Sequence, residues 1–191
     1  VCMELSAHAI YYKKADFVFD ILIFTNCTRD HLDFFGSLDR YRSVKASAFI
    51  QKNCRLAVIN ADDPLGLIIA LKRKTGTITY GIDQPSDTFA VDIKETSDGM
   101  SFIINLFDKL YDLKTKLIGR FNVYNLLAAA TACALCGLKT DYIAEKIPEL
   151  GCVRGRMQRV HSAPNVYIDY AHTPDGLENA LSALKKSTEG R

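Results

Sequence analysis

The sequence lacks an excess of charge of one sign and lacks any long hydrophobic run. Lys and Arg number 24 and Asp and Glu number 22, which leaves a formal net charge of +2. This balance gives no support to a nucleic-acid partner or an anionic membrane surface. A bilayer-spanning helix needs roughly 18 apolar residues, and the longest apolar runs are interrupted by Asp20, Asn26 or Lys72. We therefore expect neither a nucleic-acid partner nor a membrane span.

Cysteine pairs at metal-binding spacing are also scarce. Of the six cysteines, Cys133 and Cys136 form one C-x-x-C pair, with no second pair or histidine cluster at zinc-site spacing. All six lie within apolar stretches of sequence, so we interpret them as reduced thiols that pack as small hydrophobic side chains. This interpretation predicts a cytoplasmic protein.

The first ten residues, VCMELSAHAI, contain neither a basic leader nor a cleavage site, and they begin with Val. The composition, 48% hydrophobic and 24% charged, is typical of a globular protein. A length of 191 residues suffices for one domain, or for one domain and part of another. We expect the chain to be an internal piece of a longer protein.

Apolar runs alternate with amphipathic segments over the first 81 residues. Three runs, 16–26, 55–60 and 76–81, have the continuous apolar character of buried parallel strands. Two segments between them, 37–53 and 62–74, have helical spacing, with Ser37 and then Asp62 or Asp63 near their starts. This alternation predicts an α/β fold built on a mostly parallel sheet.

The pattern changes in the second half of the chain. Residues 88–119 alternate between apolar and polar side chains around the turn sequence SDG, which predicts antiparallel hairpins. Residues 122–137 predict an apolar helix that ends at Gly137, and residues 139–150 predict a shorter one. GCVRG, residues 151–155, interrupts the pattern as a linker, and residues 165–187 resume as strand, loop and helix. We therefore predict two domains, 1–155 and 156–191.

Ionisable residues crowd together where the first predicted strand ends. Arg29, Asp30, His31 and Asp33 lie within five residues, and Lys45 follows on the next predicted helix. Open α/β sheets bind ligands at the carboxyl ends of their strands. His31 and nearby carboxylates are plausible ligands of a divalent cation. A helix-capping Asp with a hydrogen-bonded His explains the same pattern equally well.

Upstream, MELSAH offers a carboxylate and a hydroxyl, Glu4 and Ser6. We expect these two side chains on one side of a strand end, where they can hold metal and substrate; a partly exposed edge is the alternative.

Amides, arginines and a carboxylate form the later candidate sites. Asn122 is a candidate N-cap, and Asn125 follows one turn later with an amide that can read a purine edge. RGRMQR, residues 154–159, has arginines suited to phosphate or to a solvated surface. Asp169 ends a predicted strand, where a carboxylate can accept ribose hydroxyls. His172 in the next loop is a candidate for the same site, for a general base, or for a structural role.

Six ordered stretches together resemble the Mur ligases, the ATP-dependent peptide synthetases of bacterial cell-wall construction. They are ELSAHA, TNCTRDHLDFFGSLDRYRSVKASAF, INADDP, GRFNVYNLLAAA, GRMQRV and DYAHTPDGLENAL. The resemblance implies an ATPase-type central domain followed by the start of a Rossmann-like C-terminal domain. The forms GRFNVYN and DYAHTPD resemble the member that adds the third stem-peptide residue. The implied reactants are ATP, Mg²⁺, a UDP-N-acetylmuramoyl dipeptide and a diamino acid, either meso-diaminopimelate or L-lysine.

The resemblance also implies roles for individual residues. Glu4 and His31 match Mg²⁺ ligands, and Lys45 matches a lysine that CO₂ converts to a carbamate, which replaces a repelling ammonium with oxygen ligands. Ser6 matches a substrate contact, and Lys14 stands where the family normally has Arg. The resemblance assigns nucleotide contacts as follows: Asn122 and Asn125 to adenine, Arg156 to phosphate and Asp169 to ribose.

The family's phosphate loop is absent, because nothing in the 191 residues fits G-x-x-x-x-G-K-[ST]. We therefore expect residues 1–191 alone to be inactive and the longer protein to be a monomeric enzyme. Two alternatives remain: another Mur-type ligase such as folylpolyglutamate synthase, and a non-catalytic nucleotide-binding module.

Overall fold

A computed structural model describes residues 1–14, 17–50, 52–96 and 98–187 of the chain. The chain divides into two compact units, Val1–Ser86 and Asp87–Arg191. The first unit contains α1 (Ala7–Tyr11), β1 (Phe19–Phe24), α2 (Leu32–Phe35), α3 (Leu38–Ser47), β2 (Cys54–Asn60), α4 (Pro64–Lys72) and β3 (Thr77–Gly81). The second contains β4 (Thr88–Thr96), β5 (Gly99–Leu106), β6 (Lys109–Thr115), α5 (Arg120–Leu135), α6 (Thr140–Lys146), the 3₁₀ helix η1 (Ile147–Glu149), β7 (Gln158–Ser162), β8 (Asn165–Ile168) and α7 (Pro174–Ser187).

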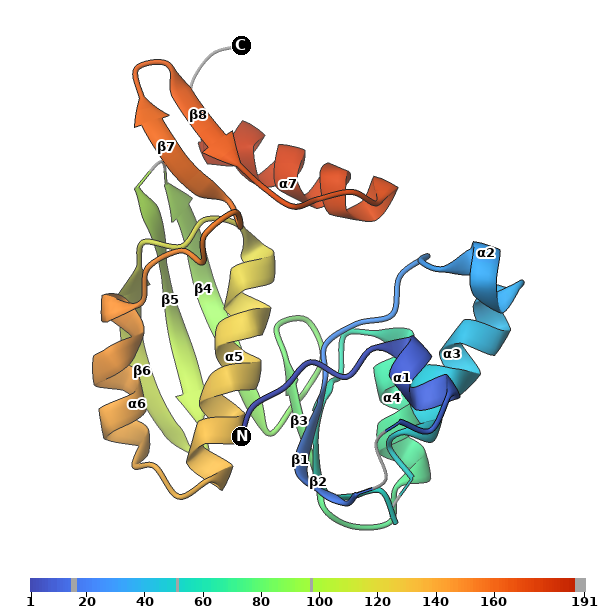
Figure 1. Cartoon of the computed structure of the whole chain (residues 1–191). Helices are drawn as coiled ribbons and strands as arrows, with labels where there is room; N and C mark the ends of the chain where they lie inside the picture. The colour runs from blue at the N-terminus through green and yellow to red at the C-terminus, as the bar shows by residue number, and fades with distance from the viewer. Residues whose placement is uncertain (15–16, 51, 97, 188–191) are drawn as a thin grey trace. The chain divides into compact units, whose positions relative to one another are not determined.

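The first unit is a parallel α/β arrangement, as the sequence predicts. Strand β1 pairs in parallel with β2, which pairs in parallel with β3, so Ile59 lies between Phe24 and Thr79. Parallel neighbours need long connections, and here these run through α3 and α4. Helices α1, α3 and α4 lie beside the strands (Figure 1). Their apolar side chains form one buried core with those of the strands, including Ala7, Leu22, Phe24, Tyr41, Phe49, Ala57, Ile59, Leu65 and Ile69.

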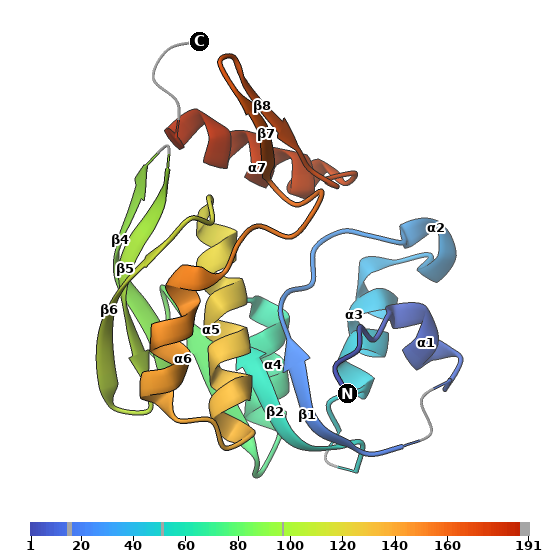
Figure 2. The same cartoon turned by 60° about the vertical axis from the view of Figure 1, so that its left-hand side comes forward.

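The second unit begins with the predicted antiparallel hairpins. Strand β5 pairs with β4 on one side and β6 on the other, so that Ile104 lies between Ala90 and Tyr111. Helices α5 and α6 cover one face of these three strands (Figures 1 and 2). Thr88 on β4 and Thr131 on α5 are both fully buried, and their hydroxyl oxygens lie 2.7 Å apart in a hydrogen bond. One hydroxyl donates to the other, so both buried oxygens have a hydrogen-bond partner in this apolar interface.

The end of the chain differs from the prediction of one strand, a loop and a helix. Strands β7 and β8 form an antiparallel hairpin, with Gln158 opposite Ile168, and α7 follows. The sequence does not predict β7 because its residues are mostly exposed and show no apolar alternation. Ala180 and Ala183 of α7 pack against Ile118 and Met157 in a small core.

The cysteines are only partly as expected. All six are free thiols, but only Cys27 and Cys54 are buried, whereas Cys2, Cys133, Cys136 and Cys152 are exposed. The packing prediction is therefore wrong for four of them. Cys133 lies in the last turn of α5 and Cys136 is the C-cap of this helix. Both side chains are exposed to solvent. Among the described residues, no helix has the length and apolarity needed to cross a membrane.

Candidate functional site

Helix α3 directs Lys45 toward the loop that follows β1. The Ser37 hydroxyl accepts a 3.2 Å hydrogen bond from the backbone N–H of Arg40 and caps this helix, as predicted. Lys45 is half-buried, and its Nζ donates a 2.8 Å hydrogen bond to the carbonyl oxygen of Asn26. The same nitrogen lies 5.8 Å from the ring centroid of Phe24 and 5.4 Å from that of Tyr41. A carbonyl and two aromatic faces, all uncharged, therefore hold this amine at the carboxyl end of β1.

Burial keeps two weakly acidic side chains near Lys45, those of Cys27 and Tyr41, in their neutral forms. Burial raises the pKa of the Cys27 thiol; the positive charge of Lys45 lowers it, and the negative charge of Asp63 raises it further. Burial also raises the pKa of Tyr41 to about 12, with smaller contributions in the same direction from Cys27 and Asp30. Both groups are therefore neutral at neutral pH, and neither supplies a counterion to Lys45.

His31 lies at the end of the loop that connects β1 to α2. It occupies the N-cap position of α2 in a left-handed conformation, with φ of 52°. Its backbone N–H donates a 2.8 Å hydrogen bond to Asp30 Oδ1, and its Nε2 lies 3.4 Å from Asp30 Oδ2. The ring also meets the ring of His8 edge-on, with 4.9 Å between centroids. Because the side chain is 43% exposed, the imidazole combines a carboxylate neighbour with access to solvent.

The segment that contains Glu4 and Ser6 is not a strand end, so that expectation is wrong. Ser6 is the N-cap of α1, and its Oγ accepts a 3.2 Å hydrogen bond from the backbone N–H of Ala9. This local hydrogen bond competes with extended structure and explains the difference. Glu4 is exposed in the segment before α1, and Lys14 is exposed just after it.

Three polar residues at the end of β2 and just after it hold the neighbouring loops in place through hydrogen bonds. None of the three was predicted from the sequence to belong to the site. Asn60 Nδ2 donates a 2.7 Å hydrogen bond to the Thr25 carbonyl oxygen. Asp63 caps α4, and its other oxygen accepts a 2.8 Å hydrogen bond from the backbone N–H of Cys27. Asp62 accepts from three backbone N–H groups of the loop after β3, those of Ile82, Asp83 and Gln84. The sequence INADDP, which contains all three residues, is the signal that could have identified them.

The two candidate adenine-site asparagines form a pair on the first turns of α5. The N-cap of this helix is Gly119, with φ of 92°, so the prediction of Asn122 as N-cap is wrong. A residue with a Cβ is strained at this φ, and an added Cβ would also crowd the ring of Phe121. Asn122 Nδ2 donates a 2.8 Å hydrogen bond to the Ile118 carbonyl, and Asn125 Nδ2 donates to Asn122 Oδ1 at 3.2 Å. The amides are therefore ordered by one another.

Asp169 joins the segments that carry the other nucleotide candidates. Its Oδ2 accepts a 2.7 Å hydrogen bond from the backbone N–H of Met157, and its Oδ1 accepts one of 2.8 Å from Ala171. The Arg156 guanidinium lies 4.8 Å from the ring centroid of Tyr170, a cation–π contact. The His172 ring meets that same ring edge-on at 5.0 Å. Arg156 and His172 are thus both arranged around one exposed tyrosine.

The small core of the second unit brings the nucleotide candidates into one region. Ile118 and Phe121, beside Asn122, pack in the same cluster as Met157, beside Arg156, and Ala171, beside His172. Segments distant in sequence therefore meet through apolar neighbours of the polar candidates. The polar side chains themselves remain at least partly accessible.

The candidate metal ligands remain a prediction. No group of three or more His, Cys, Asp or Glu side chains converges as a metal site in the part of the chain that the structure describes.

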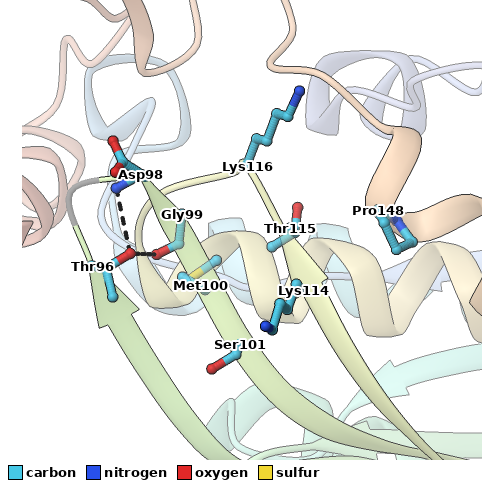
Figure 3. A pocket seen from close by; sticks show the side chains of 9 residues that line it. All are labelled: Thr96, Asp98, Gly99, Met100, Ser101, Lys114, Thr115, Lys116 and Pro148. Atoms are coloured by element: carbon cyan, nitrogen blue, oxygen red, sulfur yellow. Dashed lines mark hydrogen bonds between the residues drawn. The ribbon is translucent and has the colours of Figure 1, made fainter.

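A hollow at one end of the β4–β6 sheet involves none of the predicted residues. Its volume is about 520 Å³, and Lys114, Lys116, Ser101 and Asp98 are among the residues that line it. Figure 3 shows the two lysine side chains pointing in different directions, so no set of cations converges there.

Residues 1–133 match the family described as the Mur ligase middle domain, and residues 155–191 match the family described as Mur ligase, glutamate ligase domain. The chain therefore belongs to the Mur ligase family. It is similar to the UDP-N-acetylmuramoyl-L-alanyl-D-glutamate--2,6-diaminopimelate ligase of Geobacillus thermodenitrificans (strain NG80-2), with 39% identity over 97% of this chain and 40% of that protein. The ligase of the same name from Xanthomonas campestris pv. campestris (strain 8004) is 37% identical over 100% of this chain and 40% of its own length.

A solved structure of a ligase with this name has the same fold. It aligns with a TM-score of 0.82 and 28% identity, over 98% of this chain and 40% of that one. The chain thus spans about 40% of the length of the relatives that it matches.

Proposed function

We propose that the full-length protein is a cytoplasmic, monomeric ligase that uses ATP to join meso-diaminopimelate to UDP-N-acetylmuramoyl-L-alanyl-D-glutamate. The observation that carries the proposal is the similarity along nearly the whole chain to ligases named for this substrate pair. The sequence alone left diaminopimelate and L-lysine open, and the relatives' names favour diaminopimelate. The proposed domain boundary, between residues 155 and 156, is supported by a C-terminal family match that begins at residue 155.

Lys45 can serve as a magnesium ligand only if it is a carbamate. An ammonium held by a carbonyl cannot be a metal ligand, whereas a carbamate has two oxygens of the kind that Mg²⁺ prefers. A carbamate nitrogen also retains one hydrogen, so the 2.8 Å contact with the Asn26 carbonyl is compatible with this change. We propose that Lys45, Glu4 and His31 hold the ion. When bound, it would offset the negative charge of the phosphates and of the substrate carboxylate.

The remaining residues bind and orient the reactants in this proposal. Ser6 and Lys14 contact the UDP-linked substrate in the first unit. In the second unit, the ordered amides of Asn122 and Asn125 contact adenine, and Asp169 contacts ribose through the lone pairs that its two backbone hydrogen bonds leave available. Arg156 and His172, both arranged around Tyr170, contact the phosphates. In the proposed reaction, the γ-phosphoryl group of ATP passes to the substrate carboxylate and ADP leaves. The incoming amine then attacks the acyl phosphate and displaces phosphate, which leaves an amide bond.

A substrate comparison with the full-length protein tests this proposal. The protein is incubated with Mg·ATP, the UDP-linked dipeptide and either meso-diaminopimelate or L-lysine, while phosphate release and product mass are measured. We expect phosphate release coupled to a tripeptide product with diaminopimelate. Product only with lysine would change the amino acid, and glutamate addition to folate would instead support a folylpolyglutamate synthase. ATP binding with no ligation of any of these substrates would support a non-catalytic nucleotide-binding module.

A further inference from the structure

Two side chains from the exit of β2 hold the loop that follows β1 on both sides of Asn26. Asn60 Nδ2 donates to the carbonyl oxygen of Thr25 at 2.7 Å. Asp63 Oδ2 accepts from the backbone N–H of Cys27 at 2.8 Å. The residue between these two anchor points is Asn26, whose carbonyl oxygen accepts the 2.8 Å hydrogen bond from Lys45 Nζ. The oxygen that orients the lysine therefore lies between two clamped backbone positions.

Each of the two clamping side chains is itself fixed by a second hydrogen bond. Asn60 is only 7% exposed, and its Oδ1 accepts a 3.0 Å hydrogen bond from the backbone N–H of Asp62, which sets the orientation of the amide. Asp63 Oδ1 accepts from the backbone N–H groups of Leu65 and Gly66, at 2.8 and 3.2 Å, and so belongs to the N-terminus of α4. In each side chain, one polar atom is thus held by a hydrogen bond within its own segment, and the other polar atom makes the hydrogen bond to the loop after β1.

The close approach of α4 to β2 depends on a glycine. A Cβ built on Gly66 would collide with the carbonyl group of Asn60. The absence of this side chain lets the helix N-terminus lie directly against the end of β2, so that Asp63 is within reach of Cys27. Asn60 at the end of β2 and Asp63 at the N-cap of α4 therefore together form a clamp on the segment 25–27. This clamp lies within the first unit and its buried core.

We propose that Asn60 and Asp63 are positioning residues for Lys45, an inference that rests on the proposed carbamate of this lysine. By fixing the segment 25–27, they fix the Asn26 carbonyl, and this carbonyl sets the direction of the one N–H that the carbamate retains. The direction of that N–H decides where the two carbamate oxygens lie. Without the clamp, the carbonyl moves with its loop, and the carbamate loses its orientation and part of its stability.

The test measures carbamate formation directly in the full-length protein. Protein is titrated with ¹³C-labelled bicarbonate, and the carbamate carbon signal is followed by NMR, with Lys45→Ala identifying the signal. Asp63→Ser retains a favoured N-cap residue for α4, but its shorter side chain cannot also reach Cys27. Asn60→Ala removes the other anchor. Asp62→Ala is the matched control, because that carboxylate holds the loop after β3.

We expect both Asn60→Ala and Asp63→Ser to need roughly 10-fold more bicarbonate for half-maximal signal, the size of effect typical of outer-shell partners. Asp62→Ala should keep the wild-type value even if its thermal midpoint falls. Unchanged half-saturation in both clamp variants would overturn the positioning role and leave the proposed function intact. A wild-type protein with no Lys45-dependent signal would instead overturn the proposed carbamate itself.

Discussion

The carboxylate of Asp169 holds Met157 in an unusual backbone conformation. Asp169 Oδ2 accepts a 2.7 Å hydrogen bond from the Met157 N–H, and Met157 has φ of 46°, in the left-handed region that non-glycine residues rarely adopt. Such a conformation persists where the surroundings stabilise it. Because Arg156 precedes Met157, the residue proposed to contact ribose also sets the position of the residue proposed to contact phosphate.

Removal of this carboxylate should therefore affect stability and nucleotide binding together. We expect Asp169→Ala to lower the free energy of unfolding by about 1–2 kcal/mol, because two backbone N–H groups lose their acceptor. The affinity for Mg·ATP, measured by calorimetry on the full-length protein, should fall as well. Glu178→Ala, at an exposed position on α7, is the control and should change neither quantity. Loss of stability with unchanged ATP affinity would restrict Asp169 to a structural role.

Two substitutions of Lys45 distinguish the effect of its positive charge on ligation from the effect of its proposed carbamate. Lys45→Ala and Lys45→Arg should both reduce ligation by more than the roughly 10- to 100-fold typical of an outer-shell partner, because neither residue forms the carbamate. Arg keeps a positive charge and serves as the matched comparison. Added short-chain carboxylates should partly restore Lys45→Ala, and CO₂ depletion should inhibit the wild type. Near-normal turnover by either variant would contradict the assignment.

The neighbouring histidines His8 and His31, whose rings meet edge-on, offer a test of metal binding. His31→Ala should raise the Mg²⁺ concentration required for half-maximal activity more than it raises the KM for the amino acid. His8, whose ring lies 4.9 Å from that of His31 and packs against Phe34 at 4.4 Å, provides the control. His8→Ala should lower stability without a selective change in Mg²⁺ requirement. Equal effects of His31→Ala on both kinetic quantities would indicate a structural histidine.

The raised pKa of Tyr41 predicts how the free energy of unfolding changes at high pH. Burial raises the pKa of Tyr41 from 10.0 to about 12 in the folded chain. The unfolded chain therefore loses this proton first, so the contribution of Tyr41 to stability is complete below pH 10 and declines as the pH rises toward 12. We expect the wild type to lose about 1 kcal/mol of unfolding free energy relative to Tyr41→Phe between pH 9 and pH 11. Denaturant titrations at both pH values measure this difference, and a constant difference would contradict it.

Local patterns were sufficient for most of the elements. The apolar runs and helical spacings of residues 16–81 predict β1, β2, β3, α3 and α4 because each of these elements buries a recognisable face, whereas the short helices α1 and α2 were not predicted. Strand β7 could not be predicted in this way, since QRVHS lies largely exposed and depends on its hydrogen bonds to β8. Asn122 appears as an N-cap in the sequence because Asn favours that position. The chain instead begins α5 at Gly119, where glycine can adopt φ of 92°.

The sequence by itself determined the α/β class, the α3 cap at Ser37, and the residue types of the proposed phosphoryl-transfer site, because these follow from local propensity and chemistry. Only the tertiary structure decided that Asn60 and Asp63 hold the backbone around Asn26, and that Lys45 donates to the carbonyl between them. It likewise decided that Asp169 accepts a hydrogen bond from the backbone N–H of Met157. These relationships connect residues 12 to 36 positions apart. They exist only because burial of the apolar cores brings the ends of separate elements within hydrogen-bonding distance.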